Sequence, residues 1–223
     1  MERHFDQELS SINEKLIRMA TLSEEMIKIA IRALSERNAS IVKDVGPREE
    51  EVNRLQIEID ENVITLIARM QPVAADLRFL IAASKITGEL ERIADQAINI
   101  SQSTTFLLKY PPLKPLVIIP LMADTVRQTV AESLNAYVRR DVNLAQLVLD
   151  SDDKVDAYKD QIFRELLTYM ISDPETIQRS LTFILIARNL ERIGDHATNI
   201  AEEVIYMVQG RDVRHHHEEE QRK

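Results

Sequence analysis

Two acidic side chains four residues apart occur twice in this chain, each time in the same ten-residue segment. The segments ERIADQAINI and ERIGDHATNI begin at Glu91 and Glu191, and the second acid follows as Asp95 or Asp195. Residues four apart are neighbours on a helix surface, so each pair shares one face. Two like charges at this spacing repel each other by a few tenths of a kcal/mol. A cation held between the carboxylates would explain why both segments keep the pair.

A second polar pair precedes each segment. Asp152 and Asp156 are also four residues apart, and an offset of 103 residues maps them onto Glu49 and Asn53. If the two helices of each half lie side by side, four oxygen-bearing side chains converge. Such hard ligands suit Mg²⁺, Mn²⁺, Ca²⁺ or iron rather than a soft metal. The candidate metal ligands are therefore Glu49, Asn53, Glu91, Asp95, Asp152, Asp156, Glu191 and Asp195.

The same residues also have a simpler interpretation. Acidic side chains near helix ends are often a solvated face, and Glu49 and Asp152 would also favour the positive end of a helix dipole. Arg92 and Arg192 stand beside the two motifs and could pair with the acids. Repetition in both halves favours a metal, but the residues alone leave both interpretations open.

The chemistry of most enzyme classes is missing from the sequence. His196 follows Glu191 by five residues, which places it off the acidic stripe, so we expect a surface residue rather than a ligand. A ferritin-like di-iron centre needs Glu-x-x-His, which neither segment contains. We find no Ser/His/Asp arrangement, P-loop or Gly-rich phosphate cradle. The protein is therefore not expected to be an enzyme, and a dinuclear-metal hydrolase is the less favoured alternative.

Composition narrows the protein class further. The 223 residues carry a formal net charge of −9, which disfavours nucleic acid as a partner because binding it requires cationic side chains. The absence of cysteine excludes disulfides and thiolate chemistry. The charged N-terminus does not resemble a secretory signal, and no apolar run is long enough for membrane insertion. We expect a cytoplasmic protein.

Apolar residues recur at three- and four-residue steps over most of the chain, the period of a buried helix face. This pattern, with only 4 glycines, predicts an all-α protein. A short helix at 40–45 should stop at Gly46-Pro47, and Asp173 should cap the last long helix. Long helices are expected at about 6–37, 52–70, 73–108, 116–140, 152–171 and 174–208, with a second short one at 143–149.

Three prolines in the segment 110–115 separate two similar halves. Each half contains three long helices and a short one. We therefore expect two repeated three-helix bundles related by a pseudo-twofold axis, with one repeat at 1–110 and the other at 111–210. The polar tail at 211–223, which includes three consecutive histidines, is expected to be disordered.

The repeated motifs resemble those of a known family. LERIAD at 90–95 and LERIGD at 190–195 are similar to the signature of the PhoU family, phosphate-uptake regulators of bacteria. RMQPVAADLR at 69–78, DDKVD at 152–156 and GRDVRH at 210–215 resemble it as well. The resemblance covers almost the whole chain in the expected order.

The resemblance implies a homodimer that acts in phosphate signalling and not as an enzyme. Members are thought to contact the ATPase of the phosphate ABC transporter and the phosphate-responsive sensor histidine kinase. They thereby negatively regulate uptake and repress the phosphate-starvation regulon when phosphate is plentiful.

The resemblance also implies metal binding through an E(D)-x-x-x-D motif, as iron clusters or as Mg²⁺ or Mn²⁺. That motif falls on the acids named above. This chain departs from it at Asn53, where the second half has Asp156. The first site is therefore expected to be weaker or empty. A metal-independent helical scaffold, whose acids recruit basic partner surfaces, is the main alternative.

Overall fold

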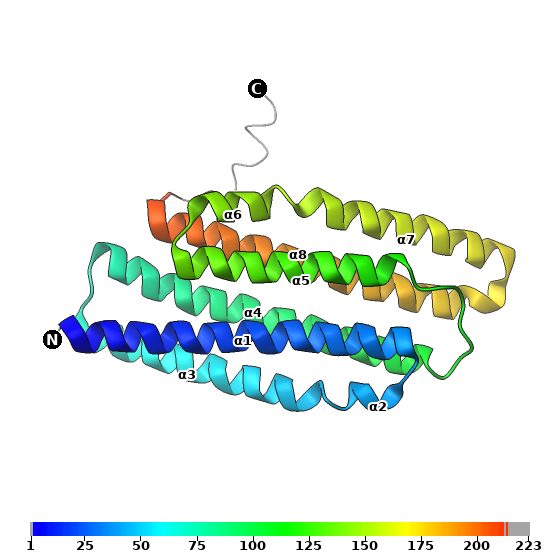
Figure 1. The fold of residues 1–223 in the computed structure, drawn as a ribbon, viewed down its shortest axis with the longest axis horizontal. Helices are drawn as coiled ribbons and strands as arrows, with labels where there is room; N and C mark the ends of the chain where they lie inside the picture. Colours follow the sequence, from blue (N-terminus) through cyan, green and yellow to red (C-terminus); the bar gives the residue numbers. More distant parts are fainter. Residues whose placement is uncertain (1, 212, 214–223) are drawn as a thin grey trace, which may run out of the picture.

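The computed structural model describes residues 2–211 and 213 of the chain, and every regular element in this part is helical. Figure 1 shows long helices that run side by side along the longest axis of the molecule. In chain order the elements are α1 (Glu2–Glu36), α2 (Ala39–Val42), α3 (Gly46–Met70), α4 (Ala74–Leu107), α5 (Ile118–Arg139), α6 (Val142–Leu149), α7 (Asp152–Ser172), the 3₁₀ turn η1 (Pro174–Thr176) and α8 (Ile177–Gln209).

Proline positions explain two helix starts. Gly46-Pro47 was expected to stop a short helix, but the structure places it in the first turn of α3. A proline is tolerated there because the first N–H groups of a helix have no intrahelical partner. Pro174 similarly follows Asp173, whose side chain accepts a hydrogen bond from the Glu175 N–H at 2.9 Å. The sequence-based α8 start is thus a 3₁₀ turn that leads into the α-helix.

The fold is all-α and contains two three-helix repeats, as the sequence predicts. Helices α1, α3 and α4 pack against one another, and so do α5, α7 and α8. Across the boundary α4 packs on α8 and α1 packs on α5. Helix α4 and its counterpart α8 therefore form the centre of the molecule, and the acidic segments lie on these two helices.

Both repeats contribute to one hydrophobic core. The apolar stripe of the repeated segment points inward: Leu90, Ile93, Leu190 and Ile193 are all completely buried. Side chains at this depth exclude water from the apolar part of the α4–α8 contact, and each buried Leu or Ile contributes about 1.5–3 kcal/mol relative to an exposed position. The repeats are units of sequence and topology, but their apolar packing is shared.

The connection between the repeats is anchored to both of them. The Arg37 guanidinium donates to the backbone oxygen of Tyr110, and Arg179 donates to that of Pro111 at 3.2 Å. Lys114 is buried and forms an ion pair with Glu165 on α7. These contacts hold the proline-rich segment in place against both repeats.

The tail is described only at Arg211 and Val213, and Val213 packs partly buried against the core. The expectation of a disordered tail, with the three histidines, falls on residues outside the described part. Within that part, no helix has the length and apolar character needed to cross a bilayer.

Removing a buried side chain from the apolar stripe of the repeated segment should destabilise the protein. Replacing Leu190 with Ala leaves a cavity in a completely buried site and should lower the free energy of unfolding by about 2–5 kcal/mol. Urea denaturation followed by circular dichroism measures this loss. Leu147, which is 63% exposed on α6, is the matched control, and its replacement by Ala should change stability by less than about 0.5 kcal/mol. Equal effects at the two positions would contradict the assignment of the core.

Candidate functional site

The acidic motifs lie on helices that pack side by side. Glu91 and Asp95 are in the middle of α4, next to α3, whose first turn contains Glu49. Glu191 and Asp195 are in the middle of α8, next to α7. The neighbouring helices required for the expected clusters are thus in place in both halves.

A lysine lies between the acids of the second half. Lys159 on α7 donates to Asp156 Oδ1 at 2.8 Å and to Glu191 Oε1 at 2.7 Å. These hydrogen bonds raise the pKa of the Lys159 ammonium, so it stays charged. The ammonium stands where a bound cation was expected. The sequence-based argument considered only Arg92 and Arg192 as cationic neighbours and missed this residue.

The first half has no such ammonium, because Gln56 occupies the position equivalent to Lys159. Burial raises the pKa of the Glu91 carboxyl, with a further contribution from the neighbouring Asp95 charge. Glu49 adds to this effect, so it lies close enough to repel Glu91. The negative charge here is only partly compensated, and a cation at this position would relieve it.

Carboxylate oxygens suit a hard divalent cation, so the chemistry of the donors fits the metal that the family resemblance implies. The arrangement of side chains is looser: within the described residues, no three Asp, Glu or His side chains converge on one point. The Asp152 side chain lies outside the described part. The metal ligands named from the sequence therefore stay a prediction.

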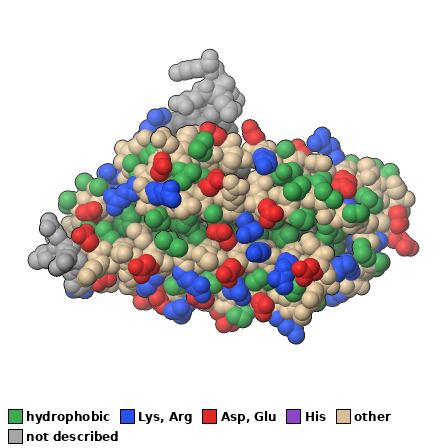
Figure 2. All heavy atoms as spheres, in the orientation of Figure 1, with side chains coloured by type: hydrophobic (Ala, Val, Ile, Leu, Met, Phe, Trp, Pro, Cys, Tyr) green, Lys and Arg blue, Asp and Glu red, His purple; other side chains and the backbone are tan. Residues whose placement is uncertain are grey.

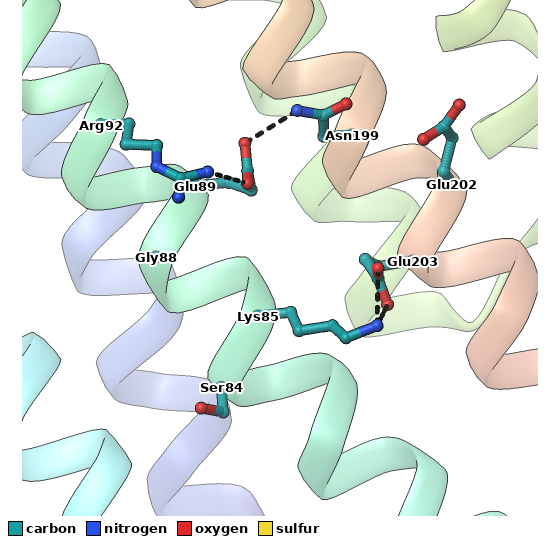
Figure 3. A pocket seen from close by; sticks show the side chains of 8 residues that line it. All are labelled: Ser84, Lys85, Gly88, Glu89, Arg92, Asn199, Glu202 and Glu203. Atoms are coloured by element: carbon teal, nitrogen blue, oxygen red, sulfur yellow. Dashed lines mark hydrogen bonds and ion pairs between the residues drawn. The ribbon is translucent and has the colours of Figure 1, made fainter. Parts of the chain in front are cut away.

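A cavity of about 490 Å³ lies between α4 and α8, at the boundary of the two repeats. Figure 3 shows two cross-helix polar pairs at its wall. Lys85 donates to both carboxylate oxygens of Glu203 at 3.0 Å, and Asn199 donates to Glu89 at 3.0 Å. The order of these contacts shows that α4 and α8 run antiparallel.

His196 belongs to this boundary and not to the surface, which corrects the sequence-based expectation. Its Nδ1 lies 2.7 Å from Glu89 Oε2, and both side chains are 13% exposed. The expectation was wrong because it placed His196 on one isolated helix. In the fold, the side of α8 next to the acidic stripe is covered by α4.

Glu89 contacts residues of both α4 and α8 at this boundary. Burial opposes its ionisation, but hydrogen bonds with His196 and Asn199, together with the attraction of His196 and Arg92, outweigh burial and lower the pKa of the carboxyl. Arg92 also donates to Glu89 Oε1 at 2.8 Å. The carboxylate is therefore charged at neutral pH and joins the two repeats.

One signal in the sequence could have revealed this pair. The offset of 100 residues maps Glu89 onto Asn189 and His196 onto Gln96. The two differences thus replace a neutral amide pair with an acid and an imidazole. They become informative only when the antiparallel contact between α4 and α8 is known.

The cavity does not have the charge of a phosphate site. Lys85 and Arg92 line it, but so do Glu89, Glu202 and Glu203. Each of the two cations is already paired with a carboxylate across or along the helices. A phosphate anion would have to displace an acid while facing an excess of negative charge, which is unfavourable at short range.

Comparison with known proteins shows which family has this architecture. The family model described as the PhoU domain matches residues 16–104 and again residues 119–204. The chain belongs to the PhoU family. The two matched ranges correspond to the two helical repeats, so each repeat is one PhoU domain.

Relatives support the assignment over almost the whole chain. The phosphate-specific transport system accessory protein PhoU homologs of Pseudomonas putida and of Aquifex aeolicus are each 38% identical to it. The match covers 96% of this chain and 84% of the P. putida protein, and 95% and 96% for A. aeolicus. The Escherichia coli protein of the same name is 36% identical, with 95% of this chain and 88% of that protein covered.

Solved structures agree. The crystal structure of PhoU from Pseudomonas aeruginosa superimposes with a TM-score of 0.88 at 37% identity, covering 93% of this chain and all of that one. PhoU from Streptococcus pneumoniae gives a TM-score of 0.85 at 23% identity, which supports the fold alone.

The Glu89 network should make stability depend on pH. Because folding lowers the pKa of Glu89, its stabilisation is present above the unfolded value of about 4.3 and is lost as pH falls through the folded value. Glu89→Gln should lower the free energy of unfolding at pH 7 by about 1–2 kcal/mol. The difference from wild type should shrink below about pH 4.

Urea titrations across the pH range test this expectation. The exposed Glu61 provides the control, since Glu61→Gln should leave the curve within about 0.5 kcal/mol of wild type. If Glu89→Gln were as stable as wild type at pH 7, the network would not join the repeats.

Proposed function

We propose that this protein is a cytoplasmic regulator of phosphate uptake and of phosphate-starvation signalling. Membership of the PhoU family, with relatives named accessory proteins of the phosphate-specific transport system, carries the proposal. In this role the chain restrains the phosphate ABC transporter and the output of the sensor kinase when phosphate is abundant. Its contacts would be the transporter ATPase and the sensor histidine kinase, and it would act as a homodimer.

The physical features of the molecule suit an adaptor rather than a catalyst. The relatives are named for accessory roles. The described part consists of packed helices, and the charged side chains at the boundary between α4 and α8 are paired with one another. We therefore propose a non-enzymatic role in which helical surfaces dock onto partners, and in which the charged clusters adjust those surfaces.

The metal proposal differs between the halves. We propose that a divalent cation or an iron cluster binds at the acidic helix clusters, with the first-half acids Glu49, Glu91 and Asp95 as its ligands there. The sequence-based expectation was a weaker first site, because Asn53 replaces an aspartate. Lys159 instead indicates that the second site is the weaker one, since its ammonium competes with a metal for Asp156 and Glu191. The metal-independent scaffold is the second candidate, and this same ammonium favours it for the second half.

Loss of the protein should release phosphate-starvation genes from repression. In cells deleted for it, a reporter of these genes should be expressed at high level in phosphate-rich medium, and the wild-type chain should restore repression. The co-purified ATPase and kinase, probed by immunoblot, test the partners. A reporter that stays repressed in the deletion strain would refute the proposed function.

A reciprocal exchange of two residues tests the metal proposal. Lys159→Gln introduces the residue of the first half and should raise the affinity of the second-half acids for Mn²⁺ by roughly 10-fold or more, because it removes a competing positive charge. Gln56→Lys introduces the ammonium into the first half and should remove binding there. Isothermal titration with MnCl₂ measures both affinities, and elemental analysis measures the metal content of the purified protein. If neither exchange changes Mn²⁺ binding, these acids do not hold the metal, and the metal-independent scaffold is the better explanation.

A further inference from the structure

A continuous row of apolar side chains is exposed where α7 and α8 lie side by side. On α7 the side chains recur every four residues at Phe163, Leu167 and Ile171, so they share one face. On α8 the same spacing gives Ile177, Leu181 and Leu185. All six are between 41% and 75% exposed. We call these six residues the α7–α8 strip.

A groove adjoins the strip and extends its apolar surface. It has a volume of about 220 Å³, and its apolar lining includes Phe163, Ile184 and Ala187. An exposed apolar patch of this extent is often functional. The α4 and α5 helices pack on other faces of α8, so this surface takes no part in joining the two repeats.

The equivalent apolar surface of the first repeat is shorter. Ile64, Leu77 and Ile81 occupy the positions of Leu167, Ile177 and Leu181 and are also exposed. Asp60, however, replaces Phe163 and accepts a hydrogen bond from Ser84 at 2.7 Å. Lys85 replaces Leu185 and is held by Glu203. Polar groups thus replace the apolar side chains at one end of the first surface, at the positions where the α7–α8 strip has Phe163 and Leu185.

This difference between the repeats bears on the kind of assembly that can form. A chain with two equally adhesive faces could add partners at both ends and grow without limit. Of these two equivalent surfaces in the described part of the chain, only the α7–α8 strip is apolar along its full length, and pairing of the strip with itself closes after two copies. An isologous dimer is the assembly that uses this surface and leaves none of it exposed.

The charges beside the strip permit such self-pairing. Asp160 and Arg164 flank Phe163 on α7, and Arg188 lies at the α8 edge of the groove. Both signs are therefore present at the rim, and a second copy brings the same mixture. Figure 2 shows acidic and basic side chains interspersed over the face in view. A partner surface with charges of only one sign would be attracted by some of these side chains and repelled by others.

The area is also of the right size. Six half-exposed side chains of this type present on the order of 500 Å² of apolar surface. A stable dimer buries about 800 Å² from each partner, of which about 65% is apolar in homodimers. The strip and its charged rim together match this requirement.

We infer that the α7–α8 strip is the homodimer interface, where it packs against the same strip of a second copy. The inference rests on the homodimer included in the proposed function and names its surface. The two dimer-related α7–α8 pairs would meet face to face, with the first repeats at the outer ends. The shorter surface on α3 and α4 would remain open in the dimer.

Sedimentation velocity of the full chain at micromolar concentrations tests the interface. Wild type should sediment as a dimer. The double variant Leu167→Glu and Leu181→Glu should weaken dimerisation at least 100-fold, because it buries four charges at the two-fold contact. The matched control is Ile64→Glu and Ile81→Glu at the equivalent exposed positions, which should remain dimeric. Circular dichroism checks that both variants are helical.

A monomeric wild type would overturn the inference, and so would equal loss of the dimer in both double variants. Because the chain has no cysteine, a second measurement avoids the apolar positions altogether. A spin label at Thr168→Cys, beside the strip, should give a short intermolecular distance by pulsed electron resonance. A label at the equivalent exposed Thr65→Cys should give a long one. A short distance only at Thr65→Cys would place the interface on the other repeat.

These outcomes are separate from the test of phosphate signalling. A deletion strain that loses repression, together with a chain that stays monomeric, would retain the proposed function and refute the interface. A dimer with the expected label distances, together with an unaffected reporter, would retain the interface and refute the function.

Discussion

The antiparallel contact between α4 and α8 is the constraint on which the rest of this structure depends. Each helix contributes the same apolar stripe, so the contact buries Leu90 and Leu190 in a core that both repeats share. The acidic faces of the repeated segments consequently point away from that core, toward α3 or α7. The positions of the acids, the polar boundary and the exposed outer strip all follow from this one contact.

Polar groups refine the contact without replacing its apolar driving force. Glu89 and His196 meet across it at 2.7 Å, and Lys85 meets Glu203 a turn away. A buried charged pair gives little net stability, because desolvation offsets most of the attraction. Its value lies in geometry: shifting α8 by one turn would leave a buried carboxylate without its donors. The pairs thus set the register that a purely apolar stripe leaves loose.

Much of the fold could be predicted from the three- and four-residue period of the apolar side chains and from the positions of the prolines. The apolar steps revealed all the long helices, and the prolines at 110–115 located the boundary between repeats. The start of α3 was mistaken because Gly46-Pro47 suits either a helix end or a first turn, and local residues do not distinguish the two. The site was harder to predict. Lys159 and His196 act through partners on other helices, and one-dimensional spacing contains no information about which helix faces which.

The pairing of Glu89 with His196 also affects how the two repeats can change in sequence. If the repeats arose by duplication, each began with the same residue at equivalent positions. The partner of Glu89 is now at 196, in the other repeat, rather than at the equivalent position 189. The copies are therefore not free to drift as independent modules. Each acts as part of the folding environment of the other, so a change in one repeat alters the surroundings of side chains in its neighbour.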